Sequence, residues 1–576
     1  MKKIFLSTII LVLLVATSCK EDALTEVPKD FYTPENSYTN KAQFESALSN
    51  IYLSIRNGIY CNLALGERAV DLLGMDIDLA DAGNNSAAAK MQYFNWPTMN
   101  ADNAFVGKWW SQFYSWIAQA NAIIDRADQP TAVWASEADK NAIVGEAKFL
   151  RAFAYHFMAN MWGGVPLVLN ETKVPKFDFV RATQEEVFQQ CKADLTEAIK
   201  YMPTIDQLKG GRAPREAAYH LLSEINISLK DYQGAIDAAT AVIDNGKNSL
   251  MTTKFGKWAN FTFSGYTYQG PKQPWSDTYF CLFQDGNFNF KEGNKEAIWN
   301  ISQDPTIKGG NNDNTAPANE PLFAMDRWWG PINWQIKDKN NVQNYLRDTL
   351  QGRPIAFLLV TGYADSVIWK YKGDFNRDIR NSKYNIQRTW YYTNPKSKYY
   401  GQEVTKSNCD ASTINLWLQR CTPHYKKFVS AVPYGKFTDA TSKLPTDNGR
   451  TYKDWYLMRL AETYLLRAEA YMLKSDNISA ANDINAIRQR ASATPVTASD
   501  VNIDLILDER ARELYGEEFR LNTLMRTGKL VEHLNKYNWY FVDNKIEFNP
   551  AWKFLPIPRR EIEANTGAVL EQNSGY

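Results

Sequence analysis

Apolar residues recur at intervals of three and four along most of residues 40–245, the spacing of a helix with one buried face. The clearest segment is 145–162. Its main apolar stripe consists of Phe149, Phe153, Phe157 and Met161. A second stripe runs beside it, so we expect a helix with a wide buried face. Gly163 and Gly164, followed by Pro166, are expected to end this helix.

Two further segments have the pattern of helical hairpins. Residues 212–245 predict a helix, a short turn at Lys230–Tyr232 and a second helix, which is typical of one tetratricopeptide unit. A weaker pair is predicted at 455–472 and 479–491. One hairpin cannot bury its apolar face alone, so we expect a mainly α fold in which tetratricopeptide-like pairs stack into a superhelical scaffold.

The helical period fades between residues 254 and 443, where Gly, Pro, Asn and aromatic residues are frequent. This stretch is too long for a plain loop. It holds nine of the 18 tryptophans, and 25 Lys and Arg against 16 Asp and Glu. An irregular, ring-rich, basic insertion on a helical scaffold is where we expect a ligand site.

The N-terminus predicts export. Two lysines precede an apolar run at residues 4–16, and Thr17-Ser18 follow it, which together indicate a signal peptide over residues 1–18. The apolar run is too short to span a bilayer.

Cys19 comes directly after these small residues and resembles the lipidated cysteine of a bacterial lipobox, although Ala16 stands where Leu is usual. A diacylated Cys19 would anchor the protein in a membrane. The charged run Lys20–Asp22 resembles the export tag of Gram-negative surface lipoproteins; a plain solvated tether is the alternative.

Charge and cysteine content give no support for a nucleic-acid partner or a metal site. The 65 Lys and Arg balance 64 Asp and Glu, so overall charge gives no argument for nucleic acid as a partner. No CxxC pair or Cys/His spacing predicts a metal site. Cys409 and Cys421, twelve residues apart, could close a loop by a disulfide, and Cys191 on a helical segment is expected to be a buried thiol.

The acidic residues Glu509, Glu513 and Glu517 raise the question of a glycosidase, which needs two opposed carboxyl groups. Residues four apart on one helix share a face, so these three cannot flank a glycosidic bond. We expect a structural ion-pair network with nearby arginines instead. The candidate partners are Arg510, Arg512, Arg520 and Arg526.

The four histidines form no nucleophilic or metal-binding arrangement in the sequence. His156 and His220 fall within helical segments, where we expect them to be hydrogen-bonded scaffold residues.

Four sequence blocks resemble the SusD/RagB family of outer-membrane nutrient-binding lipoproteins. They are Glu146–Ala152 with Trp162–Leu167, Tyr456–Glu462 with Leu466–Ala470, Glu509–Leu514 with Glu517–Arg520, and Phe554–Pro558 followed by Asn565, Gln572-Asn573 and Gly575-Tyr576. The four blocks match the family in order and spacing over nearly the whole mature chain.

The resemblance implies a cell-surface protein that binds a glycan, has no catalytic activity and no cofactor, and partners a SusC-like TonB-dependent transporter in the outer membrane. It also implies a hinged lid that closes over the transporter's pore. A peptide-binding lid of the same transporter type is the chief alternative, and a surface glycosidase is a weaker one.

A glycan site needs exposed aromatic faces for the C–H groups of sugars, beside polar side chains for their hydroxyls. Three clusters near loops meet this requirement. The candidate ligand residues are Trp96, Asn100, Trp275, Tyr279, Arg327, Trp328, Trp329, Asn333 and Trp334. Trp109, Trp110 and Trp116 lie on a helical pattern and are expected in the core or at a partner contact.

The chain therefore divides, as a prediction, into a signal peptide at 1–18, an N-terminal helical region at 19–253, a loop-rich insertion at 254–443 and a C-terminal helical region at 444–576. The basic excess of the insertion favours an acidic glycan as ligand.

Overall fold

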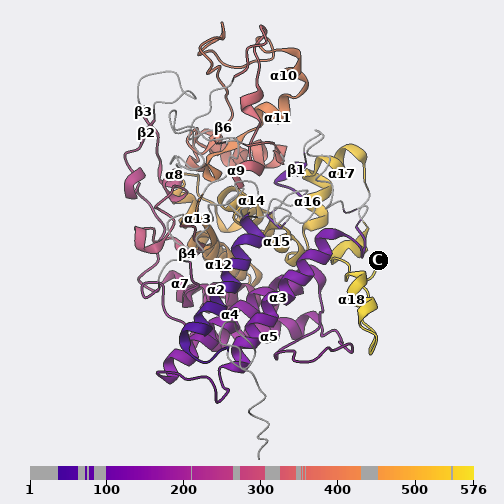
Figure 1. Ribbon diagram of the computed structural model, residues 1–576. Coiled ribbons are helices and arrows are strands. Elements are labelled where there is room, and N and C mark those ends of the chain that lie inside the picture. Colours follow the sequence, from indigo (N-terminus) through magenta and orange to yellow (C-terminus); the bar gives the residue numbers. More distant parts are fainter. Residues whose placement is uncertain are drawn as a thin grey trace, which may run out of the picture.

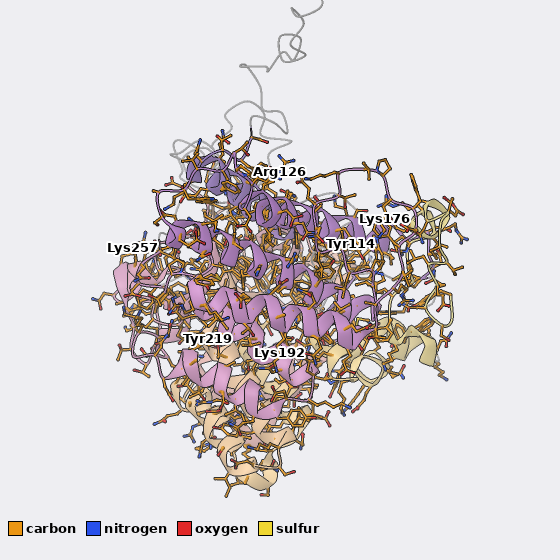
Figure 2. All side chains as sticks on the ribbon, turned by 90° about the horizontal axis from the view of Figure 1, so that it is seen from below. Tyr114, Arg126, Lys176, Lys192, Tyr219 and Lys257 are labelled. Atoms are coloured by element: carbon orange, nitrogen blue, oxygen red, sulfur yellow. The ribbon has the colours of Figure 1, made fainter. Side chains whose placement is uncertain are left out.

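Four long helices form the lower layer of the molecule, drawn from indigo to purple in Figure 1. They are α2 (Lys41–Arg56), α3 (Ala104–Arg126), α4 (Glu137–Trp162) and α5 (Gln184–Tyr201). Each begins at a polar residue whose side chain accepts a backbone N–H of the first turn, as at Ser136 for α4. Figure 2 views this layer from below, with Lys192 on α5 facing outward.

The coordinates are a computed structural model of the chain. It describes residues 37–61, 72–73, 77–82, 96, 99–208, 211–263, 273–304, 325–344, 352, 354–356, 358–429, 452–546 and 549–576. The predicted signal peptide and Cys19 lie outside these residues.

The predicted hairpin at 212–245 is present as α6 (Arg215–Ser228) and α7 (Tyr232–Ile243). A second pair, α12 (Leu460–Leu473) and α13 (Asn477–Arg490), packs against it through the contact of α12 with α7. Helix α14 (Ile503–Leu514) packs on α12. The stacked pairs confirm the mainly α, tetratricopeptide-like scaffold.

The prediction of a helix from residue 455 was wrong at its start. Trp455–Arg459 forms strand β8, which pairs antiparallel with β4 (Ala297–Ile301) from the insertion. All five side chains of β8 are buried, so its apolar spacing matches the interior of a sheet as well as a helix. Helix α12 begins only at Leu460, whose N–H donates to the Glu296 carbonyl.

The insertion contains short elements, as its fading period predicts. Its strand β5 (Leu358–Val360) pairs with β1 (Ala80–Ala82) of the N-terminal region. Within the insertion, β2 (Thr262–Phe263) pairs with β3 (Gln273–Pro274), and β6 (Ile386–Gln387) pairs with β7 (His424–Tyr425). Its short α-helices are α8 (Thr278–Leu282), α9 (Met325–Trp328), α10 (Ala411–Asn415) and α11 (Trp417–Cys421).

The C-terminal end continues through α15 (Arg520–Arg526), α16 (Leu530–Tyr537), α17 (Trp539–Asn544) and α18 (Arg559–Ala564), drawn in yellow at the side of the molecule. One large apolar core joins the three parts of the chain. Trp299 of β4, for example, lies with its ring centroid 5.2 Å from Phe149 and 5.1 Å from Phe153 of α4. The helical scaffold and the insertion therefore share their hydrophobic stabilisation.

The end of α4 contacts the C-terminal tail, although about 400 residues separate them. The indole N–H of Trp162 donates to the Pro556 carbonyl at 2.9 Å, and the N–H of Leu555 donates to the Met161 carbonyl at 2.7 Å. Gly163, with φ +74°, faces the ring of Phe554. Two of the sequence blocks quoted above thus form one junction.

We predict that Gly164→Ala destabilises this junction by about 2–4 kcal/mol, because a Cβ at Gly164 would lie 2.2 Å from the Ala182 carbonyl oxygen and the backbone would have to move. The matched control is Gly107→Ala within α3, where a Cβ meets nothing within 4 Å. We expect Gly107→Ala to be neutral or to stabilise by up to about 1 kcal/mol. Urea unfolding of both variants measures the difference, and equal midpoints would contradict the close approach.

Candidate functional site

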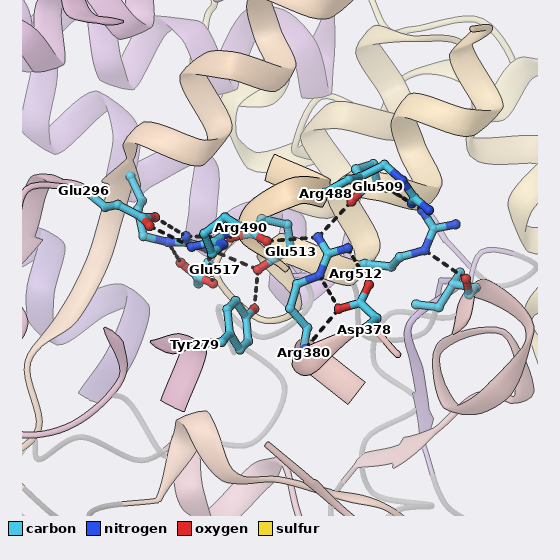
Figure 3. Close-up of polar contacts among 12 residues, drawn as sticks. Tyr279, Glu296, Asp378, Arg380, Arg488, Arg490, Glu509, Arg512, Glu513 and Glu517 are labelled. Atoms are coloured by element: carbon cyan, nitrogen blue, oxygen red, sulfur yellow. Dashed lines mark hydrogen bonds and ion pairs between the residues drawn. The ribbon is translucent and has the colours of Figure 1, made fainter. Parts of the chain in front are cut away.

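A buried cluster of paired charged side chains, which we call the charged centre, lies between the insertion and the C-terminal helices (Figure 3). Arg459, 1% exposed, is the hub. Its Nη1 donates to Glu296 at 2.8 Å and to Glu513 at 2.7 Å, and its Nε donates to Glu517 at 2.8 Å. Arg490 contacts the same Glu296 and Glu513 carboxylates. The charges are therefore paired and largely hydrogen-bonded, which buried charges require.

The predicted ion-pair role of Glu509, Glu513 and Glu517 is confirmed, but most of the partners differ from the prediction. Among the arginines proposed, Arg512 contacts Glu509 at 2.7 Å. The others pair elsewhere: Arg510 with Glu462 and Glu518, Arg520 with Asp78, and Arg526 with Glu469. The main partners are Arg380, Arg459, Arg488 and Arg490, which come from distant segments. Closeness in sequence therefore could not predict these four arginines as partners.

This network makes stability depend on pH. Burial alone would raise the pKa of Glu509, but the attraction of Arg380, Arg512 and Arg488 outweighs it and lowers the pKa to about 2. The unfolded chain has an ordinary carboxyl pKa of about 4.3. We therefore predict that this contribution is complete above about pH 5 and is lost as the pH falls towards about 2. Urea midpoints measured at decreasing pH test this; a constant midpoint down to about pH 3 would contradict it.

His156 and His220 lie within helices and contact polar partners, as predicted, although His156 Nδ1 has no hydrogen-bond partner among the described residues. His156 Nε2 lies 3.3 Å from Glu224, and His220 Nδ1 lies 2.8 Å from the Thr463 hydroxyl. Cys191 is a fully buried thiol, also as predicted. Cys409 and Cys421 contact the same apolar cluster but are free thiols, so the proposed disulfide is absent from this structure.

Five of the rings predicted as sugar platforms are buried. Trp96, Trp275, Tyr279, Trp328 and Trp329 are each 6% exposed or less. A ring enclosed on both sides offers no face to a sugar, so in this conformation these residues serve packing. Composition predicted a ring-rich insertion, but Tyr279, Trp328 and Trp329 are packed in the large apolar core that the insertion shares with the helical scaffold.

Contacts explain two of these positions. The Tyr279 hydroxyl donates to the Glu513 carbonyl at 2.6 Å and so belongs to the charged centre (Figure 3). Trp329 stacks on Phe428 with centroids 5.3 Å apart and meets Tyr515 edge-on at 5.0 Å.

The other candidates have different environments. Asn333 is 8% exposed, and the Arg327 side chain lies outside the described part of the structure. Asn100 is exposed before α3, with its Oδ1 accepting the Asp102 N–H at 2.9 Å. Trp334, on the 3₁₀-helix η8 (Asn333–Gln335), is half-buried, and its Nε1–H donates to the Pro354 carbonyl at 3.1 Å. Trp334 is thus the predicted ring with an accessible surface and a fixed indole edge.

Trp334 belongs to a small lobe that we call the aromatic lobe, formed by residues 333–344 and 388–422. Figure 1 shows its helices α10 and α11 at the end of the molecule opposite α5. Backbone hydrogen bonds such as Val404 N–H to the Trp390 carbonyl, 2.7 Å, hold its loops together. Its apolar core consists of Ile336, Trp390, Tyr392, Val404 and Cys409.

The surface of the aromatic lobe combines rings with positive charge. Trp417 is half-exposed, with Lys406 Nζ 5.7 Å from its ring centroid, and Tyr400 is 46% exposed. The exposed lysines of the lobe are Lys339, Lys396, Lys398 and Lys406. Sequence reasoning missed Trp417 and Tyr400; the available signal was their position beside lysines within the predicted insertion.

A second ring pair lies outside the lobe. The half-exposed Tyr384 meets Trp275 edge-on with centroids 5.3 Å apart, and the exposed Lys383 lies over both rings. Tyr384 therefore carries the accessible part of the cluster that Trp275 was predicted to supply.

The described residues contain neither a cluster of metal-ligand side chains nor a helix able to span a membrane. No three His, Cys, Asp or Glu side chains among them gather as a metal site would require. Within the same described ranges, every helix is too short or too polar to cross a membrane.

The stacked helical pairs form a scaffold, and the ring-rich insertion packs on it and exposes its loops to solvent. Residues 295–576 match the family model described as "SusD family", and residues 24–227 match the model described as "Starch-binding associating with outer membrane". The chain belongs to the SusD/RagB family, which is associated with the outer membrane.

Curated relatives resemble the chain, one over nearly its whole length and another over about a quarter of it. SusD-like protein P25 of Formosa agariphila is 24% identical over 591 residues, covering 97% of both chains. The starch-binding protein SusD of Bacteroides thetaiotaomicron is 35% identical over 154 residues, 24% of this chain and 27% of that one.

Solved structures share the fold. A laminarin binding SusD-like protein has a TM-score of 0.62 at 22% identity, covering 94% of this chain and 100% of its own. Surface glycan-binding protein A from Bacteroides thetaiotaomicron, in complex with laminarihexaose, has a TM-score of 0.65 at 19% identity, covering 93% and 100%.

Proposed function

We propose that this protein captures an oligosaccharide at the cell surface and delivers it to a SusC-like TonB-dependent transporter, as a hinged lid and without chemistry of its own. Diacylated Cys19 is its anchor in the outer membrane. The observation that carries the proposal is the family match over residues 24–227 and 295–576, together with full-length fold relatives whose names specify glycans.

The aromatic lobe supplies the chemistry that such a ligand needs. Trp334 presents a half-buried indole whose orientation is fixed by a hydrogen bond. Because the side chain is already ordered, it loses little conformational entropy when a sugar stacks on it. Residues 254–443 remain our proposed ligand region, and Trp334 is its accessible ring among the predicted residues. Asn100, in the N-terminal region, is the other exposed member of the predicted set. The charged centre offers a glycosidase no reaction site, because its carboxylates are buried and paired.

The exposed lysines of the aromatic lobe favour an acidic glycan, since carboxylate or sulfate groups would pair with them.

Affinity electrophoresis of the mature protein through gels containing neutral or acidic polysaccharides tests both the capture of a glycan and the preference for an acidic one. Retardation by any glycan supports glycan capture, and retardation by acidic polymers alone supports the narrower class. Calorimetry with a peptide panel runs beside it. Binding of peptides with no glycan retained would overturn glycan capture in favour of a peptide-binding lid.

A further inference from the structure

A segment without regular structure, residues 172–180, lies between α4 and α5 and exposes apolar side chains; we call it the strap. Figure 2 shows its Lys176 at the edge of the helical layer. Four large apolar side chains of the strap and of the adjoining C-terminal tail are between 53% and 79% exposed: Val174, Phe177, Val180 and Val569. Single exposed apolar side chains are common, whereas a group of this kind marks an interaction surface.

Hydrogen bonds hold the strap against the tail. The Phe179 N–H donates to Asn565 Oδ1 at 2.7 Å, and Asn565 Nδ2 donates to the carbonyls of Phe179 and Ala568, both at 2.8 Å. The Gly567 N–H donates to the Phe177 carbonyl at 2.6 Å. The strap and the tail therefore present their apolar side chains from an ordered backbone, so a partner would lose little conformational entropy in meeting them.

The charges around this surface fit a protein better than a lipid bilayer. Lys173, Lys176 and Asp178 are exposed within the strap, and the exposed Glu571 borders it, since its carbonyl accepts from Arg181 at 2.9 Å. An apolar centre with a polar rim is the usual anatomy of a protein–protein interface. An anionic membrane surface attracts basic rims, and the acidic residues here would oppose that attraction.

The strap also lies where the chain arrives from its proposed anchor. The described chain begins at Ser37, eighteen residues after Cys19. Arg126 Nη1 donates to the Ser37 hydroxyl at 3.1 Å, and Arg126 Nε donates to Glu171, directly before the strap, at 3.0 Å. Eighteen residues span at most about 60–65 Å, so a lipidated Cys19 would keep the strap near the outer membrane. A partner embedded in that membrane is therefore within reach of the strap.

We infer that the strap and Val569 form the surface by which this protein docks on the extracellular face of its membrane transporter, with Phe177 as the central anchor. Aromatic side chains that enter a partner's apolar recess commonly dominate such interfaces. The choice of the transporter as the occupant rests on the proposed function. Because the docking surface lies beside the anchor, and the aromatic lobe lies at the end of the molecule opposite α5 (Figure 1), the strap can stay docked while the lobe moves.

The test measures the dissociation constant of the mature protein for the SusC-like transporter, purified in detergent from the same cells. We expect Phe177→Asp to weaken binding at least about tenfold, because a carboxylate would replace the anchor ring in an apolar recess. Ile478→Asp is the matched control, since Ile478 is a 69% exposed side chain near the start of α13, and it should bind as the wild type does. Both variants should keep the wild-type urea midpoint and glycan retardation.

A second readout uses intact cells and the lipidated chain. A photoreactive p-benzoylphenylalanine placed at position 177 should cross-link to the transporter on irradiation, and the same group placed at position 478 should not. Mass spectrometry identifies the adduct. No adduct with the transporter from position 177, or equal adducts from both positions, would contradict the docking surface.

The outcomes separate this inference from the proposed function. If the wild type binds the transporter and Phe177→Asp binds equally well, the docking surface is wrong and delivery to the transporter stands. If the wild type does not bind the transporter, delivery fails together with the docking surface, and glycan retardation still tests capture. A dimer of the mature protein, or flotation with phospholipid vesicles, that Phe177→Asp abolishes would overturn the inference in favour of a second copy or the bilayer.

Discussion

Arg459→Ala is expected to lower the free energy of unfolding by about 3–5 kcal/mol, the largest effect that we predict for one side chain. Arg459 hydrogen-bonds to Glu296, Glu513 and Glu517, and all four residues are at most 5% exposed. Its removal leaves buried carboxylates without their shared partner, and water cannot replace the lost contacts. Urea unfolding followed by circular dichroism measures the change.

The control is Arg559→Ala, because Arg559 pairs with Asp102 at 2.9 Å while both side chains are more than half exposed. A surface pair of this kind contributes about 1 kcal/mol or less. Similar losses for Arg459→Ala and Arg559→Ala would show that the charged centre does not stabilise the junction of the insertion with the C-terminal helices. A large loss for Arg459 alone would agree with the structure.

Trp334→Ala is expected to weaken the binding of a retained glycan by about 10- to 30-fold, equivalent to about 1.4–2 kcal/mol. The indole of Trp334 is partly accessible and is oriented by its hydrogen bond to the Pro354 carbonyl, so the variant removes a preformed sugar platform. Isothermal calorimetry with an oligosaccharide of the polymer retained in electrophoresis gives the dissociation constants.

Tyr201→Ala is the matched control, because Tyr201 is a 43% exposed ring at the end of α5, in the helical layer. We expect this variant to bind as the wild type does. Equal weakening by both variants would indicate a general loss of structure, and unchanged binding by Trp334→Ala would remove Trp334 from the site.

Local periodicity predicted the scaffold well. The apolar stripes of 145–162 lie in α4, and the hairpin at 212–245 is α6 and α7, because the contacts that shape these helices come from neighbouring residues. The start of α12 was misplaced because the hydrogen bonds of β8 come from β4, more than 150 residues earlier. No local pattern contains that information.

The site was harder to predict. Sequence identified the ring-rich insertion, but it could not distinguish the buried Trp328 from the half-buried Trp334, six residues later. Both follow the same aromatic and polar composition, and only tertiary packing separates them. The ion-pair network was predicted from the spacing of its glutamates, whereas Arg380 and Arg459 could not be assigned, since they come from a short 3₁₀-helix and a strand distant in sequence.

The most direct test of the central claim, that helices hold up a glycan-binding aromatic surface which performs no chemistry, is a crystal structure of the mature protein grown with an oligosaccharide of the glycan it retains. The account predicts an intact oligosaccharide with one sugar ring stacked on Trp334 of the aromatic lobe. An oligosaccharide bound only away from this lobe, or cleaved in the crystal, would contradict it.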